Sequence, residues 1–257
     1  MSTIILENTA NRFKANLGKR RQAGFWLTSD SVVATEYAAN AGFDWVLLDM
    51  EHTLLDLGRV EKHLLASRGA AAELVVRVPA IDPVLLKRLL DAGIRSFMFP
   101  NVRTEEEARL AVAATRYPPD GIRGFSGGHR LNGYGDATQH YLEHYAQNLC
   151  ILLQVESPQG IESIPKMGNV PGVDALFIGP NDLSFNYGDG GAQTPRMHDV
   201  IVAALHSIRQ TEAAAGILDF SKDGARRWFD LGFDHIAVGG DVSTLTRGIS
   251  ALAADFA

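Results

Sequence analysis

The chain has 257 residues, of which 46% are hydrophobic and 21% charged, and its formal net charge is −6. This length suits one domain with a large core, and the negative charge excludes the basic surface that nucleic acids or anionic membranes require. A single cysteine, Cys150, excludes an internal disulfide and indicates a reducing compartment. The apolar run at residues 4–6 is too short for a signal peptide, and no segment approaches the roughly 20 apolar residues of a membrane span. We therefore expect a cytoplasmic protein.

Short apolar runs alternate with amphipathic segments along the chain. The runs predict eight strands, at residues 24–28, 45–50, 74–78, 96–102, 151–156, 175–179, 216–218 and 235–238. Nearly continuous apolar runs are typical of parallel strands that are covered on both faces. So many strand–helix units in a chain of this length favour an α/β fold of the closed (β/α)8 barrel type over an open doubly wound sheet. We predict one barrel domain over residues 1–257.

The segments between the runs carry helix signals. They predict helices at 83–90, 104–115, 195–215 and 223–231, with Thr104 and Glu107 resembling a capping box and with Gly93 and Gly232 as helix stops. Two long, glycine-rich connections interrupt the pattern, at 117–148 and 185–196. Long loops in a compact domain are more often functional than accidental, although the sequence does not assign a role to the connection at 117–148.

Polar residues follow the apolar runs where the predicted strands end, and in a barrel these carboxyl ends gather at one mouth. Glu156 and Asp182 follow two consecutive strands, and neighbouring strands lie about 4.8 Å apart, so both carboxylates can hold one cation. Oxygen ligands without a cysteine favour Mg²⁺ or Mn²⁺. Each carboxylate taken alone is explained equally well as a cap of the helix that follows it. For the pair together, beside Gln154, we favour a metal site.

Two more residues at the strand ends are candidates for catalysis. Arg77 lies within an apolar run, and a buried guanidinium needs anionic partners. Asp49 is a candidate structural partner of Arg77, and a substrate oxyanion is a candidate catalytic partner. A single guanidinium can bind both. His52 follows two acids at a strand end and is a candidate general base. The alternative for His52, a hydrogen-bonded loop residue, stays open.

The lysines argue against one kind of covalent catalysis. A Schiff-base enzyme needs a desolvated lysine inside the barrel. None of the six lysines lies within an apolar strand run, and Lys87 and Lys166 belong to helical segments whose charged ends reach solvent. We therefore expect no covalent imine chemistry.

Several stretches of the chain are similar to the HpcH/HpaI family of metal-dependent, class II pyruvate aldolases. They occur in family order and span nearly the whole chain, which makes the set more specific than any one stretch. They are residues 42–52, ending in Asp49-x-Glu51-His52, and 76–79, 87–93, 113–119, 154–156, 177–184 and 237–239. The chain departs from the usual family pattern at Met50, where glycine or threonine is common, and at Asn101, where an apolar residue is common. Both departures lie near the expected pocket and leave the aldehyde preference open.

The resemblance implies a metal ion held by the residues that match Glu156 and Asp182, either Mg²⁺ or Mn²⁺, with Co²⁺ as a further candidate. It implies that pyruvate binds this ion through its carboxylate and keto oxygen. Arg77 matches the arginine that stabilises the developing enolate oxygen. Gln154 lines the same pocket, and Ser184, in the adjoining motif, is a further candidate for substrate binding.

The resemblance also implies that active sites lie between subunits. His52 and Asp91 match the pair that handles protons, but we place Asp91 near the end of a helix, at the barrel face opposite His52. The two can meet only if Asp91 comes from a neighbouring subunit. We therefore expect a homo-oligomer, a hexamer by family habit, whose C-terminal helix, ending at residues 252–256, can exchange between subunits.

The expected reaction is the reversible cleavage of a 4-hydroxy-2-oxo acid to pyruvate and an aldehyde. The segment 124–135 is closer to the 2-dehydro-3-deoxyglucarate aldolase branch, which acts on sugar acids, than to the homoprotocatechuate branch. Arg130 in this segment is a candidate for binding the distal carboxylate of an acidic aldehyde, and pairing with a surface acid explains it equally well. The expected partners are thus small molecules, an oxo acid and an aldehyde.

Two other functions remain open. A citryl- or malyl-CoA lyase-like enzyme would need a basic patch for the CoA phosphates, and the sequence shows none. A protein that binds a keto acid without turning it over could keep the same ligand groups. It would, however, have no use for His52 and Asp91.

Overall fold

A closed barrel of eight parallel strands forms the centre of the computed structural model, which describes residues 10–257. The strands pair in chain order, and β8 returns to β1. The strands are β1 Gln22–Leu27, β2 Trp45–Asp49, β3 Glu73–Arg77, β4 Ser96–Phe99, β5 Cys150–Val155, β6 Ala175–Ile178, β7 Ala214–Leu218 and β8 His235–Gly240. The predicted (β/α)8 fold is confirmed. The apolar run at residues 4–6 lies outside the described residues.

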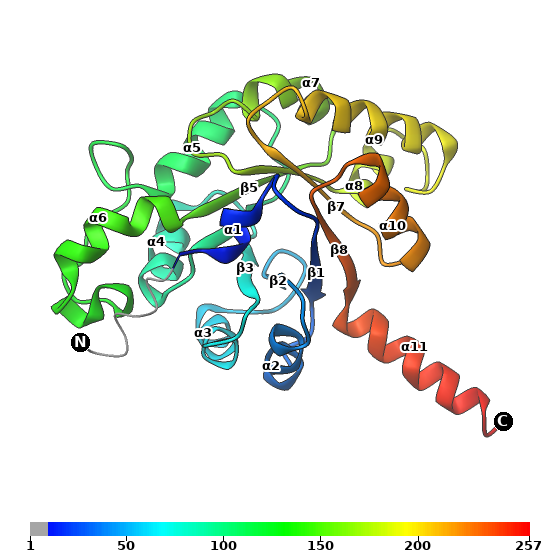
Figure 1. Ribbon diagram of the computed structural model, residues 1–257, viewed down its shortest axis with the longest axis horizontal. Coiled ribbons are helices and arrows are strands. Elements are labelled where there is room, and N and C mark those ends of the chain that lie inside the picture. Colours follow the sequence, from blue (N-terminus) through cyan, green and yellow to red (C-terminus); the bar gives the residue numbers. More distant parts are fainter. Residues whose placement is uncertain (1–9) are drawn as a thin grey trace.

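Helices lie between the strands and around the barrel (Figure 1). They are α1 Arg12–Asn16, α2 Val32–Asn40, α3 Leu57–Ala66, α4 Pro83–Ala92, α5 Glu105–Thr115, the 3₁₀ helix η2 Arg130–Gly135, α6 Thr138–Asn148, α7 Pro158–Met167, α8 Pro180–Asn186, α9 Pro195–Ile208, α10 Lys222–Leu231 and α11 Asp241–Ala254. Among the described residues, no helix combines the length and the apolar character needed to cross a bilayer. The long connection predicted at 117–148 contains η2 and α6.

Most helix ends follow the predicted signals. Gly93 and Gly232 end α4 and α10 with φ values of +127° and +116°, which glycine adopts without strain. The Thr104 hydroxyl caps α5 by accepting from the Glu107 amide at 3.2 Å. The predicted capping box is only half formed, because the Glu107 carboxylate accepts from the Arg103 amide at 2.7 Å.

One predicted helix is too long. The helix predicted at 195–215 ends at Ile208, and Ala214 and Ala215 belong to β7, where they pair with Ala175 and Leu176 of β6. Alanine favours helices in isolation, but pairing between strands outweighs that weak preference. Local propensity therefore gave the wrong end for this element.

Alternate residues of each strand face the interior of the barrel. In β5, Leu152 packs in the interior cluster, whereas Ile151 and Leu153 pack between the strands and the surrounding helices. Because side chains of a strand alternate between its two faces, Gln154 and then Glu156 continue the interior series. The same alternation brings polar groups of β2 and β3 to the interior at their carboxyl ends.

Aromatic rings fill the amino end of the barrel. Phe13 of α1 is fully buried, and its ring centroid lies 5.5 Å from that of Trp45 and 5.6 Å from that of His235. The polar mouth at the carboxyl ends is therefore the end at which a ligand can approach the interior.

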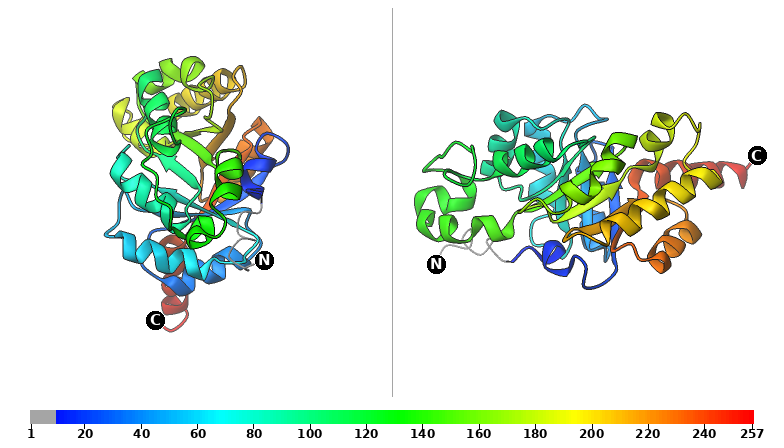
Figure 2. Two further views of the ribbon diagram at one scale, coloured as in Figure 1. Left: turned by 90° about the vertical axis from the view of Figure 1, so that its left-hand side faces the viewer. Right: turned by 90° about the horizontal axis from the view of Figure 1, so that it is seen from above.

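The last helix, α11, projects away from the barrel, as all views show (Figures 1 and 2). None of its residues is buried. Its large exposed apolar side chains recur at spacings of three and four residues, and they are Val242, Leu245, Ile249 and Leu252, followed by Phe256. This spacing forms one continuous apolar stripe along the helix.

Candidate active site

An ion pair between β2 and β3 forms the floor of the mouth. Asp49 and Arg77 are register partners at the ends of these strands. Arg77 donates from Nε to Asp49 Oδ1 at 2.9 Å and from Nη2 to Oδ2 at 2.5 Å, and its guanidinium lies 4.8 Å from the Trp26 ring centroid. Burial opposes ionisation of Asp49, but the hydrogen bond and charge of Arg77 outweigh it, so the pKa of Asp49 is lowered. Asp49 therefore holds Arg77 in one orientation.

Glu51 is a second acid on the same arginine. Its Oε2 lies 2.9 Å from Nη1 of Arg77. Burial raises the pKa of Glu51, and the charges of Asp49 and Asp182 add to this effect, whereas Arg77 and His52 oppose it. We did not single out Glu51 from the sequence. Its two-residue spacing from Asp49 was the available signal, because residues two apart on an extended segment share a face.

Glu156 is a buried acid at the end of β5. It is 4% exposed, and its Oε1 has no hydrogen-bond partner among the described residues. Burial, together with the negative charges of Glu51 and Asp182, raises the pKa of Glu156 to about 8. A buried carboxylate oxygen that lacks a partner is costly unless a cation approaches it. This environment fits a bound metal ion.

Gly179 provides the space for this carboxylate. A Cβ atom at Gly179 would lie 2.6 Å from Cγ and from Oε1 of Glu156, and 2.9 Å from Nε2 of Gln154. Gln154 is 1% exposed, and its Oε1 likewise has no partner among the described residues. The amide and the carboxylate thus face the same glycine, with polar oxygens that a ligand could satisfy.

Asp182 and Ser184 lie on α8, the short helix that follows β6. Asp182 is in the first turn and exposed, and its charge acts on both Glu51 and Glu156. Ser184 is buried, and its hydroxyl donates to the Asn181 carbonyl at 2.7 Å. Its hydroxyl is therefore engaged within its own helix.

His52 lies at the rim of the mouth. Its side chain is 63% exposed, and its Nε2 is 3.8 Å from Oε2 of Glu51. The residues that the chain itself brings together at the carboxyl ends are thus Arg77, Gln154 and Glu156 in the interior, with His52 and Asp182 nearer to solvent.

Asp91 lies elsewhere. It is the penultimate residue of α4, and it accepts from Nη2 of Arg123 at 2.7 Å. Arg123 is buried, donates from Nη1 to the Tyr141 hydroxyl at 2.8 Å and lies 4.4 Å from the Tyr117 ring centroid. The Asp91 side chain remains 24% exposed. The connection from 117 to 148 therefore holds the Asp91 side chain in place. Arg123 was not predicted from the sequence, because its partners are distant in sequence.

Arg130 also lies apart from the mouth of its own chain. It begins η2, and one of its guanidinium nitrogens approaches Gly93 at the end of α4, where a Cβ atom would meet it at 3.6 Å. Its side chain lines a cavity near the start of β3. Asp91 and Arg130 are thus both removed from the carboxyl ends of the strands.

The arrangement at the mouth is suited to stabilising an oxyanion beside a cation. No group of three His, Cys, Asp or Glu side chains within the described part of the chain forms a complete ligand set. Glu51 is turned toward Arg77, so Glu156 and Asp182 are the two carboxylates that a metal ion could use. Two protein ligands are typical of a hard divalent ion that leaves positions for water and substrate.

Comparisons with known proteins agree on one family. The model of the HpcH/HpaI aldolase/citrate lyase family matches residues 22–247. The 5-keto-4-deoxy-D-glucarate aldolase of Escherichia coli O9:H4 (strain HS) is 41% identical over 251 residues, which cover 96% of each chain.

Solved structures show the same architecture. A HpcH/HpaI aldolase/citrate lyase family protein from Burkholderia cenocepacia J2315 is 36% identical, with a TM-score of 0.91 over 96% of this chain and 99% of that one. Protein CitE from Mycobacterium tuberculosis, solved with magnesium and acetoacetate, is 16% identical, with a TM-score of 0.58 over 87% of each chain. This second likeness is one of fold.

Proposed function

The chain belongs to the HpcH/HpaI aldolase/citrate lyase family and is an enzyme of the class II aldolase type, and from this we propose that it acts on a sugar-derived 4-hydroxy-2-oxo acid. The reaction is the reversible cleavage of this acid to pyruvate and an aldehyde. Support comes from the Escherichia coli relative, whose name gives 5-keto-4-deoxy-D-glucarate as its substrate. Such a relative favours an oxo acid over the CoA thioester of a citryl- or malyl-CoA lyase.

The family is in general dependent on a divalent metal ion, and we propose that Glu156 and Asp182 hold it here. The partnerless Oε1 of Glu156 and its raised pKa support this assignment, because a cation would offset the burial of that carboxylate. Mg²⁺ is the first candidate, since CitE from Mycobacterium tuberculosis was solved with magnesium; Mn²⁺ and Co²⁺ follow. When bound, the ion supplies a Lewis acid for the negative charge that develops as the carbon–carbon bond breaks.

Arg77 and Gln154 provide the fixed polar groups for the keto acid. Two of the Arg77 donors are held by Asp49, so the guanidinium is oriented before substrate arrives. A preorganised donor stabilises a developing oxyanion more than a mobile one, because no reorganisation is needed at the moment of reaction. Gln154 offers its amide from the same interior face, and Ser184 supports the wall formed by α8.

His52 handles the proton of the C4 hydroxyl, with Asp91 of a neighbouring subunit as its partner. The exposure of His52 at the rim and the remaining exposure of Asp91 support a meeting across an interface. Arg130 lies near the same end of α4 as Asp91. It would bind the distal carboxylate of the aldehyde across the same subunit interface. This proposal requires a homo-oligomer, for which we propose a hexamer. The exposed apolar stripe of α11 is the surface that would exchange between subunits.

The observation that carries the proposal is the buried carboxylate of Glu156, whose Oε1 has no hydrogen-bond partner among the described residues, in a chain of this family. It is tested by measuring pyruvate release from 5-keto-4-deoxy-D-glucarate and related 4-hydroxy-2-oxo acids, with and without a chelator. Parallel reactions contain citryl-CoA and malyl-CoA. We expect chelator-sensitive release from the oxo acids, restored by adding Mg²⁺, Mn²⁺ or Co²⁺.

Two substitutions extend this test to the ligands. Glu156→Gln and Asp182→Asn should each lower kcat by about 100-fold or more, because each removes a negative ligand from the ion. Asp223→Asn, in the first turn of α10 and 96% exposed, is the matched control and should keep wild-type activity. Turnover that survives in both ligand variants, or that ignores the chelator, would contradict the assignment.

A further inference from the structure

Two histidines lie one turn apart on α6, and neither belongs to the candidate active site. His140 is exposed and His144 is half-buried. Helix α6 lies at the outer edge of the molecule, on the side away from α11 (Figures 1 and 2). Their spacing of four residues is by itself explained by the solvated face of a helix. The structure adds two observations that point to a ligand.

The first observation is that the two imidazole rings face each other. Their centroids are 4.4 Å apart, and their planes are inclined by 33°. Residues four apart on a helix are neighbours on one face, so both rings project from the same side of α6. Imidazole nitrogens bind a metal ion at about 2.0–2.1 Å, which places two nitrogens on one ion roughly 3 Å apart. The rings are therefore close enough for one ion to bridge them.

The second observation is that one ring already has the orientation of a ligand. Nδ1 of His144 lies 2.8 Å from the carbonyl oxygen of His140. A carbonyl oxygen only accepts, so Nδ1 carries the proton of the neutral ring and Nε2 carries the lone pair. Histidines that bind metals make this same bond to a backbone carbonyl, which fixes the tautomer and the ring orientation. Nε2 of His144 is thus the nitrogen that an ion would use.

We propose that His140 and His144 bind a divalent transition-metal ion of the Ni²⁺, Cu²⁺ or Zn²⁺ class. Imidazole suits these ions, whereas Mg²⁺ prefers oxygen ligands. Glu143 follows His140 by three residues and adds negative charge to the same turn; its carboxylate accepts from Gln139 at 3.1 Å. Within residues 10–257, no set of three such ligands forms, so water fills the other positions on the ion.

An ion at this pair would cross-link two turns of a helix that begins without a side-chain cap. Ala137 precedes α6, and no side chain accepts from the amides of the first turn. Tyr141, between the two histidines, is buried and accepts from Arg123 at 2.8 Å. Binding to the folded state raises the unfolding temperature. The proposal is independent of the aldolase function.

The experiment uses isothermal titration calorimetry and thermal unfolding of the untagged, full-length protein. Nickel chloride and copper(II) chloride are the probes, and magnesium chloride is the control. Because Glu156 and Asp182 can also attract these ions, the titrations use both the wild type and Glu156→Gln. In Glu156→Gln we expect saturable binding of Ni²⁺ and tighter binding of Cu²⁺, as the usual order of affinities requires. Both should raise its unfolding temperature, and Mg²⁺ should do neither.

Three further substitutions, made in the Glu156→Gln protein, locate the site. His140→Gln and His144→Gln should each weaken Ni²⁺ binding by about tenfold or more, because each removes a ligand. His198→Gln is the matched control and should bind like its parent. The His198 side chain is 41% exposed, and its ring stacks on Trp228 at 5.3 Å. In the wild-type background, His140→Gln and His144→Gln should keep normal pyruvate release with Mg²⁺.

Three results would overturn the proposal. The first is the absence of saturable binding of both probe ions to Glu156→Gln. The second is full Ni²⁺ binding after His140→Gln and His144→Gln. The third is a loss of affinity after His198→Gln equal to that after His144→Gln, which would indicate general binding to surface histidines. Failure of the aldolase proposal is separate, because it would appear as pyruvate release that ignores the chelator.

Discussion

The backbone of Gly179 lies so close to the Glu156 side chain that only glycine fits at this position. A methyl group there would overlap the Glu156 carboxylate and approach the Gln154 amide. Gly179→Ala should therefore displace both side chains while the strand pairings of the barrel remain. We expect kcat to fall at least about tenfold, because a displacement of about 1 Å in a catalytic group has effects of this size or larger.

The measurement for Gly179→Ala is pyruvate release over a series of metal concentrations, and we also expect half-maximal activity to need more metal ion. Gly191→Ala is the matched control, because a Cβ atom at Gly191 meets nothing within 4 Å. Equal activity of the two variants would show that the space at Gly179 has no role in placing Glu156.

The raised pKa of Glu156 makes stability depend on pH. The ordinary pKa of a glutamate is 4.5, and in the folded, metal-free protein it is about 8. Between these values the folded state binds more protons than the unfolded chain, so the free energy of unfolding falls as pH rises through this window. Glu156→Gln removes the titrating group. The variant should therefore gain stability relative to the wild type as pH rises, by at most about 1.4 kcal/mol for each unit between the two pKa values.

Urea denaturation in the presence of EDTA, at pH 5 and at pH 8, measures this difference. The gain should be much smaller at pH 5, which lies just above the ordinary pKa of 4.5, than at pH 8, where nearly the whole window between the two pKa values has been crossed. A stability difference that is the same at both pH values would contradict the pKa assignment.

Individual site residues were predictable where a polar side chain interrupts or ends an apolar run. Arg77, Gln154 and Glu156 stand out in this way, and all three face the barrel interior in the structure. Glu51 was missed because it follows its strand and is held by an ion pair to Arg77, which local sequence does not display. Arg123 was missed because local sequence does not display its contacts with Asp91 and Tyr141 either.

At the scale of elements, the strands were more predictable than the helix ends. Apolar runs mark buried parallel strands because both faces are covered, and each predicted run coincides with a strand to within a few residues. Ala214 and Ala215 were assigned to a helix, because alanine gives no sign of the β6 pairing that makes them a strand. The helices within 117–148 were not resolved from the sequence, since their packing depends on a buried arginine.

The contribution of Arg123 to the packing of the connection at 117–148 can be tested by substitution. Arg123→Ala removes the donors to Asp91 and Tyr141 and leaves a gap against Tyr117. Loss of one partner of a largely buried ion pair should lower the free energy of unfolding by roughly 3 kcal/mol. Chemical denaturation measures the change.

Arg109→Ala is the control for this substitution, because Arg109 is an exposed arginine paired with Glu105 on the surface of α5. It should change stability by less than about 0.5 kcal/mol. An equally small effect of Arg123→Ala would mean that the cluster around Asp91 contributes little to the fold.

At the scale of the whole molecule, the separation of His52 from Asp91 predicts complementation between subunits. His52→Ala and Asp91→Ala should each be nearly inactive alone. If each site takes His52 from one subunit and Asp91 from another, random mixing of the two variants in equal amounts leaves about a quarter of the sites intact. We expect about a quarter of wild-type activity from co-expressed hybrids.

The measurement is pyruvate release by hybrid oligomers whose mixed composition has been verified by native mass spectrometry. A control mixture of His52→Ala with Arg77→Ala should recover no activity, because both residues come from the same chain's mouth and every site then lacks one of them. No recovery in His52→Ala/Asp91→Ala hybrids would show that Asp91 does not complete a neighbour's site.

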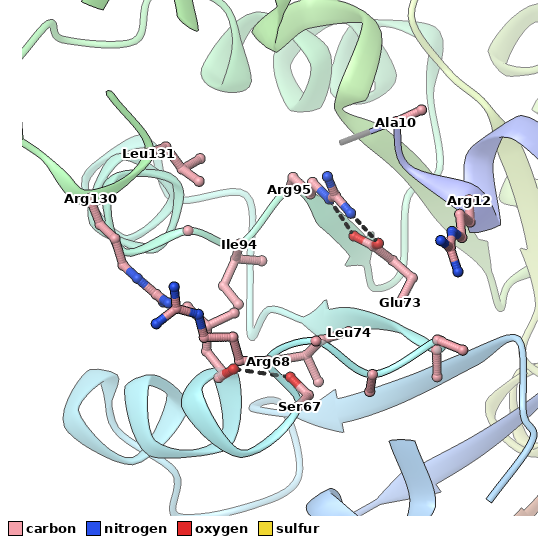
Figure 3. Close-up of a pocket in the computed structure, with 16 residues that line it drawn as sticks. Ala10, Arg12, Ser67, Arg68, Glu73, Leu74, Ile94, Arg95, Arg130 and Leu131 are labelled. Carbon is pink, nitrogen blue, oxygen red and sulfur yellow. Dashed lines mark hydrogen bonds and ion pairs between the residues drawn. The ribbon is translucent and has the colours of Figure 1, made fainter. Parts of the chain in front are cut away.

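Strand β3 begins at Glu73, whose two carboxylate oxygens both accept from Arg95 (Figure 3), and ends at Arg77, in the floor of the mouth. Five residues of one strand thus join an ion pair at the amino end of the barrel to the candidate active site. The strand is fastened at its first and its last side chain, so the position of the Arg77 guanidinium is set by the barrel itself before any ligand arrives.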